Sequence, residues 1–352
     1  MKARKKILIR VDGHKRIGMG HIYRMLTLAN YLRKKNCFTF VFVARGCAAS
    51  LVLIKKSGFP VEALPFGISR GSEIDNLADI LRCHRPSMVI SDVLRSDRDE
   101  NFMGALGYNK GVILVSFNDD TKRRLVDADI IFSSDLSQRA DLYGNTQGAK
   151  YYLGFDYLIL NEAYMRINKR RRKINKCVKR VVVCMGGADQ HNLTAKILRA
   201  IDKSSLNFKC EVIVNSNFFD KTLAQQLSDS LAHAVSFNFD VDSLAASFAR
   251  ADLAITSGGL VHLERMCAGV PGIAINQHCR QADLSARIMR QGATLDLGLH
   301  NRVSLGKIFY SFNDLSQDYP LRVKMAVKGK ELVDGEGLLR IAKIINHALG
   351  GK

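Results

Sequence analysis

A histidine stands near the start of the chain, where a glycine-containing loop gives way to an expected helix. The apolar run at residues 7–9 predicts a strand, Gly18 and Gly20 lie in the loop after it, and the helical stretch opens at His21. The first N–H groups of a helix lack intrahelical partners and carry partial positive charge, so this arrangement is typical of anion sites. A helix N-terminus also favours the neutral imidazole, which can accept a proton. We therefore predict that His21 is a general base.

Two charged residues accompany this histidine. Arg24 lies one helical turn after His21, on the same face of the expected helix, where it could help to bind a diphosphate. Asp12 stands at the end of the strand, where its carboxylate could orient an imidazole or a substrate hydroxyl. Both His21 and Asp12 also have a plain structural interpretation, as a helix-start residue and a polar loop residue.

Two further glycine loops follow apolar runs in the second half of the chain. Backbone N–H groups in such loops, together with a serine hydroxyl, would bind a diphosphate at a helix N-terminus. Glu264 lies about one and a half turns into the helix after the second loop, and its carboxylate could accept hydrogen bonds from both hydroxyls of a ribose. For the first loop, a simple turn is an equally good interpretation. The predicted nucleotide-binding residues are Gly186, Gly187, Ser257, Gly258, Gly259, Leu260 and Glu264.

Short apolar runs alternate with helical stretches along both halves of the chain. Continuous apolar strands separated by helices indicate parallel sheets that are covered on both faces. We therefore expect two Rossmann-like, doubly wound α/β domains that face each other across a ligand cleft. In the first half, strands are expected at 7–9, 38–44, 61–64, 88–91, 112–117 and 130–133, with helices from 21 and at 48–56, 74–83 and 98–106. In the second half, strands are expected at 181–184, 210–214, 235–239, 252–256 and 270–275, and the tail from 304 to 347 is expected to be helical.

Length and composition agree with this architecture. A chain of 352 residues exceeds what one hydrophobic core usually supports, which favours two domains. No apolar run approaches the roughly 18 residues of a membrane-spanning helix, and no export cleavage site is evident, so we expect a cytoplasmic protein. The eight cysteines form no C-x-x-C pair, which excludes the common zinc spacings and gives no sign of a disulfide framework.

The net charge of +20 is the extreme feature of the composition. It permits binding to nucleic acid, to an anionic membrane surface or to phosphorylated ligands. Residues 166–180 hold nine basic residues and no acidic one. No aromatic residue interleaves with these charges, so a solvated linker or linking helix is favoured over a nucleic-acid patch.

Three motifs in order carry a resemblance to known enzymes. They are Asp12 with Ile17-Gly18-Met19-Gly20-His21-Ile22-x-Arg24, then Cys184-Met185-Gly186-Gly187-Ala188-Asp189-x-x-Asn192-Leu193, then Ser257-Gly258-Gly259 with Glu264 and Gly269-Val270-Pro271. Together they resemble the UDP-sugar hydrolases of pseudaminic acid biosynthesis, which release UDP from UDP-2,4-diacetamido-2,4,6-trideoxy-β-L-altropyranose. The second half is more distantly similar to the peptidoglycan N-acetylglucosaminyltransferases. The match runs from about residue 5 to residue 300.

This resemblance implies a fold, a reaction and further site residues. It implies the glycosyltransferase-B fold, UDP bound mainly by the second domain, no metal requirement and no cofactor. It also implies that His21 activates water for inverting attack on the anomeric carbon of a UDP-activated deoxy amino sugar, in the synthesis of nonulosonic acid surface glycans. The residues expected near the sugar or the diphosphate are Gly18, Gly20, Arg24, His262 and Gln281, with His262 where an asparagine or an aromatic residue would be usual.

The expected domain division follows from these patterns. Residues 1–165 form the domain with the catalytic loop, 166–178 the basic linker and 179–310 the UDP-binding domain. The helical tail at 311–352 is expected to pack back toward the first domain, as the resemblance implies, and we expect a monomer.

Two other functions stay open. A glycosyltransferase would use the same UDP-sugar site and pass the sugar to an acceptor alcohol, and the basic surface would suit peripheral association with an anionic membrane that holds the acceptor. A non-catalytic nucleic-acid-binding protein would use the positive charge alone, but no specific nucleic-acid motif is present.

Overall fold

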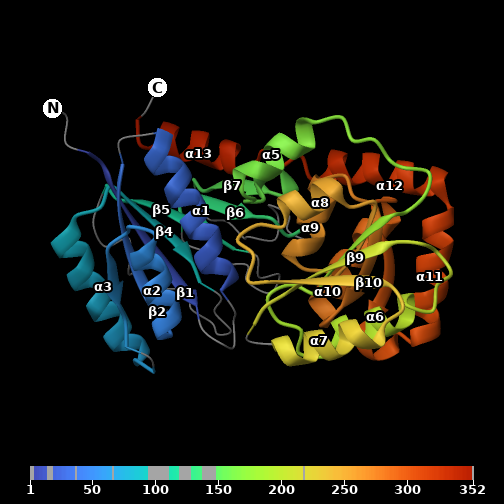
Figure 1. The fold of residues 1–352 in the computed structure, drawn as a ribbon. Coiled ribbons are helices and arrows are strands. Elements are labelled where there is room, and N and C mark those ends of the chain that lie inside the picture. The colour runs from blue at the N-terminus through green and yellow to red at the C-terminus, as the bar shows by residue number, and fades with distance from the viewer. Residues whose placement is uncertain are drawn as a thin grey trace. The chain divides into compact units, whose positions relative to one another are not determined.

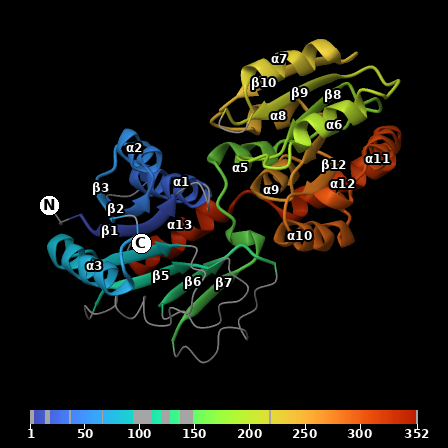
Figure 2. The same ribbon diagram turned by 90° about the horizontal axis from the view of Figure 1, so that it is seen from below.

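The computed structural model describes residues 4–13, 19–35, 38–65, 67–93, 111–118, 128–136, 148–216 and 219–350. The chain divides into two compact units, shown in Figures 1 and 2. The first unit comprises Met1–Leu160 together with Glu336–Lys352, and the second unit comprises Asn161–Gly335. Each unit is built around its own parallel sheet, with helices on both faces.

The first unit contains a seven-stranded sheet in the order β3-β2-β1-β4-β5-β6-β7, and every neighbouring pair is parallel. Its strands are β1 (Lys6–Gly13), β2 (Thr39–Gly46), β3 (Val61–Ala63), β4 (Met88–Asp92), β5 (Ile113–Phe117), β6 (Ile130–Ser133) and β7 (Lys150–Leu153). Its helices are α1 (Gly20–Lys35), α2 (Ala48–Lys56), α3 (Arg70–His84), the 3-10 helix η2 (Phe155–Tyr157) and α13 (Gly337–Ala348).

Strand β1 is buried along nearly its whole length because both faces of its sheet are covered. Successive side chains of a strand point to opposite faces. Ile9 and Val11 therefore lie in the core beneath α1 and α13, whereas Leu8 lies in the smaller core beneath α3. Helix α13 comes from the far end of the chain, and Ile341 and Ile345 bury it in the core of the first unit.

The second unit contains a six-stranded sheet in the order β10-β9-β8-β11-β12-β13, again parallel throughout. Its strands are β8 (Arg180–Cys184), β9 (Lys209–Val214), β10 (Ala234–Phe239), β11 (Leu253–Thr256), β12 (Gly272–Asn276) and β13 (Leu295–Leu299). Its helices are α5 (Glu162–Lys169), α6 (Leu193–Ile201), α7 (Lys221–Ser230), α8 (Ala245–Arg250), α9 (Leu260–Cys267), α10 (Cys279–Arg290), η3 (His300–Arg302), α11 (Leu305–Gln317) and α12 (Tyr319–Leu332).

Both sheets have the doubly wound order expected from the alternation of strands and helices. Counted along the chain, the strands of each unit run 3-2-1-4-5-6, and the first unit adds a seventh strand at the edge. The direction of winding reverses between β1 and β4 in the first unit and between β8 and β11 in the second. Ligands of such sheets bind at the carboxyl ends of the strands beside this reversal. Candidate residues should therefore lie at these two places.

The division of the chain differs in detail from the expected one. The first unit ends at Leu160, and of the expected tail only residues 336–352 belong to it, while α11 and α12 belong to the second unit. The expected basic linker overlaps α5, and its Arg172 is not a solvated side chain. Its guanidinium is partly buried and donates to carbonyl oxygens at the ends of α8 and α9. Basic groups are stabilised at helix C-termini, which explains this placement.

The structure does not describe every expected element. The helix expected at 98–106 lies outside the described residues. Strand β7 is not among the expected elements, and helix α5 overlaps the start of the stretch at 166–180, where a linking helix is one of the two interpretations. In the part of the chain that the structure describes, no helix is long and apolar enough to cross a membrane.

Candidate active site

His21 lies in the first turn of α1, at the reversal of strand order in the first unit. Its Nδ1 atom is 2.8 Å from Oδ1 of Asp92, the last residue of β4. Asp92 is fully buried, and β4 is the strand next to β1 on the side away from β2. The imidazole is therefore held by a carboxylate at the carboxyl end of a neighbouring strand.

Arg24 contacts the same carboxylate. Its Nε atom donates to Oδ2 of Asp92 at 2.9 Å, and one terminal nitrogen donates to Oδ1. The guanidinium lies 5.4 Å from the ring centroid of Phe117, within cation–π range. These contacts hold Arg24 against Asp92, and its expected contact with the diphosphate stays a prediction.

Two neighbouring groups keep Asp92 in its ionised form. Burial alone would raise the pKa of this carboxyl, but Arg24 and His21 lower it far below its usual range. A carboxylate cannot donate a hydrogen bond, so Nδ1 of His21 is the donor in the shorter, 2.8 Å contact, and the Arg24 nitrogen that lies 3.3 Å from Nδ1 is then not hydrogen-bonded to it. The other ring nitrogen, Nε2, is then the one that can accept a proton from a substrate.

Asp92, rather than Asp12, is the carboxylate that contacts His21. Asp12 is two residues from Arg10 on β1, so both side chains lie on the face of the sheet that α3 covers. There the Asp12 carboxylate accepts from Arg10 and from Arg45, which hold its pKa below the usual range although burial raises it. Val11, one residue earlier, is the residue paired with Asp92 in the sheet.

Of the two glycines in the first loop, the structure describes only Gly20. Gly18 lies outside the described residues. Gly20 is the first residue of α1, and a Cβ added there would meet no atom within 4 Å. Steric crowding among the described residues therefore does not require glycine at position 20.

In the second unit, the two glycine loops follow β8 and β11, which are adjacent strands at the reversal of order. Gly186 has a φ of +83°, which favours glycine. Gly258 is tightly enclosed, since an added Cβ would lie 2.0 Å from Oδ1 of Asn276 and 2.5 Å from Oγ of Ser285. The backbone before α9 is therefore packed closely against the end of β12 and against α10.

Two glutamines connect these loops. The side chain of Gln277 donates from Nε2 to the Met185 carbonyl at 2.7 Å, and its backbone N–H donates to Oε1 of Gln281 at 2.9 Å. Gln281 in turn lies beside Gly258 and Gly259. Gln281 is thus next to the loop that is expected to bind the diphosphate, and its contact with the sugar stays a prediction.

Helix α9 presents Leu260 and Glu264 on one face and His262 on the opposite one. At 100° per residue, positions 260 and 264 nearly coincide around the axis, whereas position 262 points away from both. Leu260 is 47% exposed and Glu264 is partly exposed. His262 is fully buried, with Nδ1 3.3 Å from the hydroxyl oxygen of Thr256. The structure therefore places His262 away from the face that carries Leu260 and Glu264, and its contact with the sugar stays a prediction.

Glu264 has an unusual protonation equilibrium. Burial raises the pKa of its carboxyl group to about 8, and the nearby Tyr164 hydroxyl opposes the rise only in part. The pKa of His262 moves in the opposite direction. Burial, and then the charge of Arg265, lower it well below its usual value. His262 is therefore a neutral, internal residue.

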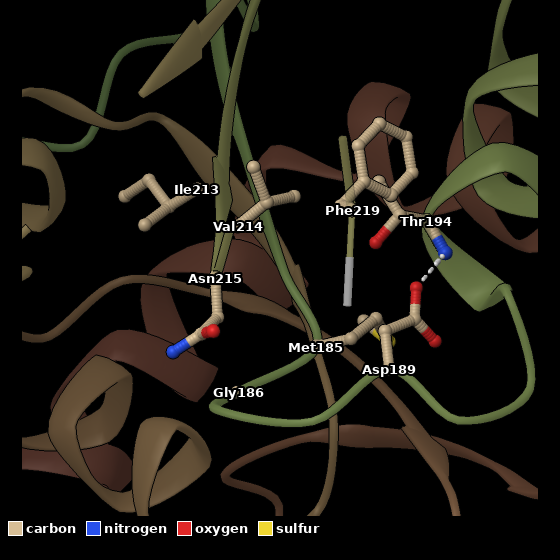
Figure 3. A pocket seen from close by; sticks show the side chains of 8 residues that line it. All are labelled: Met185, Gly186, Asp189, Thr194, Ile213, Val214, Asn215 and Phe219. Atoms are coloured by element: carbon tan, nitrogen blue, oxygen red, sulfur yellow. Dashed lines mark hydrogen bonds between the residues drawn. The ribbon is translucent and has the colours of Figure 1, made fainter. Parts of the chain in front are cut away.

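A hollow of about 200 Å³, including its solvent-open part, lies beside Gly186. It is shown in Figure 3 and is lined by Met185, Gly186, Asp189, Thr194, Ile213, Val214, Asn215 and Phe219. The Asp189 carboxylate accepts from the backbone N–H groups of Leu193 and Thr194, each at 2.8 Å. Asp189 therefore fixes the start of α6 and gives the loop after β8 its shape.

Sequence reasoning did not find Asp92 or Gln277. Asp92 has the same signal as Asp12, a carboxylate directly after an apolar run, but strand register is needed to know which of the two faces α1. Gln277 also follows an apolar run, at 272–275, and only its contact with Met185 reveals its role.

Comparisons with known proteins place these features in context. No family model matches the chain. The chain is 26% identical over 341 residues to the spore coat polysaccharide biosynthesis protein SpsG of Bacillus subtilis, covering 95% of this chain and 96% of that protein. It is 24% identical over 205 residues to the UDP-2,4-diacetamido-2,4,6-trideoxy-β-L-altropyranose hydrolase of Campylobacter jejuni, covering 57% of this chain and 67% of that protein.

Solved structures resemble the chain over nearly its whole length. MurG of Acinetobacter baumannii superposes with a TM-score of 0.70 at 13% identity, covering 97% of this chain and 99% of that one. The chain has the GT-B fold. Alr3699/HepE of Anabaena, solved in complex with UDP and glucose, gives a TM-score of 0.61 at 14% identity, covering 99% of this chain and 100% of that one. The two Rossmann-like domains expected from the sequence are thereby confirmed.

Proposed function

We propose that this protein is an enzyme of polysaccharide biosynthesis that hydrolyses a UDP-activated deoxy amino sugar. The observation that carries the proposal is the 2.8 Å contact between His21 and the buried Asp92 at the reversal of strand order in the first unit. A histidine oriented by a carboxylate is an arrangement that activates an oxygen nucleophile. The similarity to SpsG and to the Campylobacter hydrolase supports nucleotide-sugar chemistry.

In the proposed reaction, a water oxygen attacks the anomeric carbon from the face opposite UDP. Nε2 of His21 takes a proton from this water while Asp92 stabilises the imidazolium that forms. The bond between the anomeric carbon and the β-phosphate oxygen breaks, and UDP leaves with the electron pair. The products are UDP and the free sugar with inverted anomeric configuration.

The second unit would bind the UDP part of the substrate. N–H groups at the start of α9 and in the loop at Gly186–Gly187 would receive the diphosphate, where they stabilise the charge that develops on the leaving group. Glu264, on the partly exposed face of α9, would accept hydrogen bonds from the ribose hydroxyls. Gln281, beside the same loop, would contact the sugar.

The test is incubation with a panel of UDP-sugars while free UDP and free sugar are followed by proton NMR. His21→Ala should lower turnover by about 10²–10⁴-fold, the usual contribution of a general base, with UDP affinity nearly unchanged. His84→Ala is a matched control, because His84 also contacts a carboxylate, that of Glu62, but lies on α3. Near-normal turnover of His21→Ala would remove His21 from the mechanism.

Transfer to an acceptor alcohol is the alternative, because the same histidine and aspartate would deprotonate an alcohol as well as water. The relative that covers 95% of this chain is named for polysaccharide biosynthesis and not for hydrolysis, which keeps this alternative open. Release of free sugar at full rate in the absence of any acceptor would decide for hydrolysis. UDP release that requires an added acceptor would decide for transfer.

A further inference from the structure

Tyr164 is a fully buried residue of α5 in the second unit. Its hydroxyl group makes no hydrogen bond of standard geometry among the described residues, and the group that it approaches is the carboxyl group of Glu264. Buried polar groups are nearly always hydrogen-bonded, because an unpaired one loses its hydration without compensation. The weak pairing of this buried hydroxyl therefore requires an explanation.

The group that the hydroxyl approaches is the carboxyl group of Glu264. Helix α5 packs on α9, and this contact brings Tyr164 next to Glu264. The helices are held together by Asn168, whose amide donates to the Cys267 carbonyl at 3.1 Å, and by Cys267, whose Sγ lies 3.7 Å from the Tyr164 carbonyl. These two contacts between α5 and α9 fix the position of Tyr164.

Among the described residues, few groups near Glu264 stabilise its negative charge. Burial is the main influence on the pKa of Glu264 and raises it, and the Tyr164 hydroxyl is the described group that lowers it. The thiols of Cys184 and Cys267 also lie near this carboxyl group, and burial raises the pKa of each to about 12, so both stay neutral. If Glu264 ionises when a ligand donates hydrogen bonds to it, its carboxylate would need a further hydrogen-bond donor from the protein.

We infer that Tyr164 is a positioning residue for Glu264, whose hydroxyl donates a hydrogen bond to the carboxylate once a ribose diol is bound there. This inference rests on the proposed binding of UDP by the second unit. The tyrosine would hold one carboxylate oxygen so that the remaining acceptor positions face the two ribose hydroxyls. Hydrogen bonds to a charged group are the stronger ones, so the effect on affinity should be measurable.

The experiment compares UDP with 2′,3′-dideoxyuridine 5′-diphosphate, which lacks both ribose hydroxyls, by titration calorimetry. The wild-type protein should bind UDP more tightly, by on the order of tenfold or more. Tyr164→Phe should weaken UDP binding by about tenfold and leave the affinity for the dideoxy ligand unchanged. Because this hydroxyl makes no hydrogen bond of standard geometry in the free protein, the variant should melt close to the wild-type temperature.

Two further variants sharpen the comparison. Glu264→Gln should also reduce the preference for UDP, and the double variant Tyr164→Phe/Glu264→Gln should lose little more, because the two residues act on the same hydroxyls. Tyr310→Phe is the matched control, because Tyr310 is an exposed tyrosine of the same unit, and it should bind both ligands like the wild type.

Two results would overturn the inference. Tyr164→Phe could keep the full preference for UDP, or it could weaken both ligands equally, as a structural role would. Failure of the proposed function looks different, because the wild-type protein would then bind neither ligand or would not distinguish them.

Discussion

Asp92 is the residue on which the first half of the site depends, because it contacts both His21 and Arg24. Replacement by asparagine removes its charge and offers an amide N–H to Nδ1, which favours the wrong imidazole tautomer. Asp92→Asn should therefore lower kcat by about 10²–10⁴-fold while UDP affinity is unchanged. Steady-state kinetics and UDP titration measure the two effects. Asp79→Asn, at an exposed position of α3, serves as the control. A wild-type kcat in Asp92→Asn would contradict the proposed pairing of His21 with Asp92.

Glu264 should make UDP binding depend on pH. Its pKa of about 8 means that the free protein holds it mostly protonated at lower pH, whereas a ribose diol binds the ionised form. UDP affinity should therefore rise as pH increases, by about tenfold per unit below pH 8, and level off above it. Titration calorimetry between pH 6.5 and 9 checks this. Glu264→Gln should remove this pH dependence of UDP affinity. Identical pH profiles of the wild-type protein and the variant would refute the role of Glu264.

At the level of elements, the loop before α9 depends on close packing at Gly258. A Cβ at this position would overlap Asn276 and Ser285, which are held by their own hydrogen bond of 2.8 Å. Gly258→Ala should lower the free energy of unfolding of the second unit by about 1–3 kcal/mol, as overpacking usually does, and weaken UDP binding. Gly259→Ala is the matched comparison and should cost less, because the closest atom to its Cβ would be at the flexible end of Gln281, at 3.1 Å. Equal melting temperatures for the two variants would count against this account.

The sequence predicts the elements better than the contacts between them. Apolar runs and glycine loops are local features, so the strands and the helices that carry His21 and Glu264 are found at nearly their observed positions. Helical phase could also have shown that His262 lies opposite Glu264 on α9. The choice between Asp12 and Asp92 could not be made, because it depends on which face each strand turns toward α1.

Other features had no usable signal in the sequence. Tyr164 lies in the first turn of α5, before the stretch at 166–180 where a linking helix is considered, and its role depends on the packing of α5 against α9. Arg172 has the same residue type as its exposed neighbours, and only the nearby helix ends explain why it is partly buried. Such residues are identified by tertiary contacts, which local sequence patterns do not contain.

At the scale of the whole molecule, the first unit is completed by a helix from the other end of the chain. Helix α13 buries Leu338, Ile341 and Ile345 in the core of that unit. Full burial of each such side chain contributes about 1.5–3 kcal/mol, so the three together contribute roughly 5–9 kcal/mol, against a total stability of about 5–15 kcal/mol for a domain. The second unit, in contrast, is one continuous stretch, Asn161–Gly335.

Deletion of residues 336–352 should therefore unfold the first unit and spare the second. Scanning calorimetry of the truncated chain should show the transition of the second unit near its wild-type temperature, while that of the first unit is lost. UDP at 100 times its Kd should still stabilise the remaining transition, by about 2.7 kcal/mol, because its proposed site lies within the second unit. The fragment 161–335, expressed alone, provides the reference transition. Loss of both transitions on truncation would show that the two units do not fold independently, and survival of both would show that α13 is dispensable.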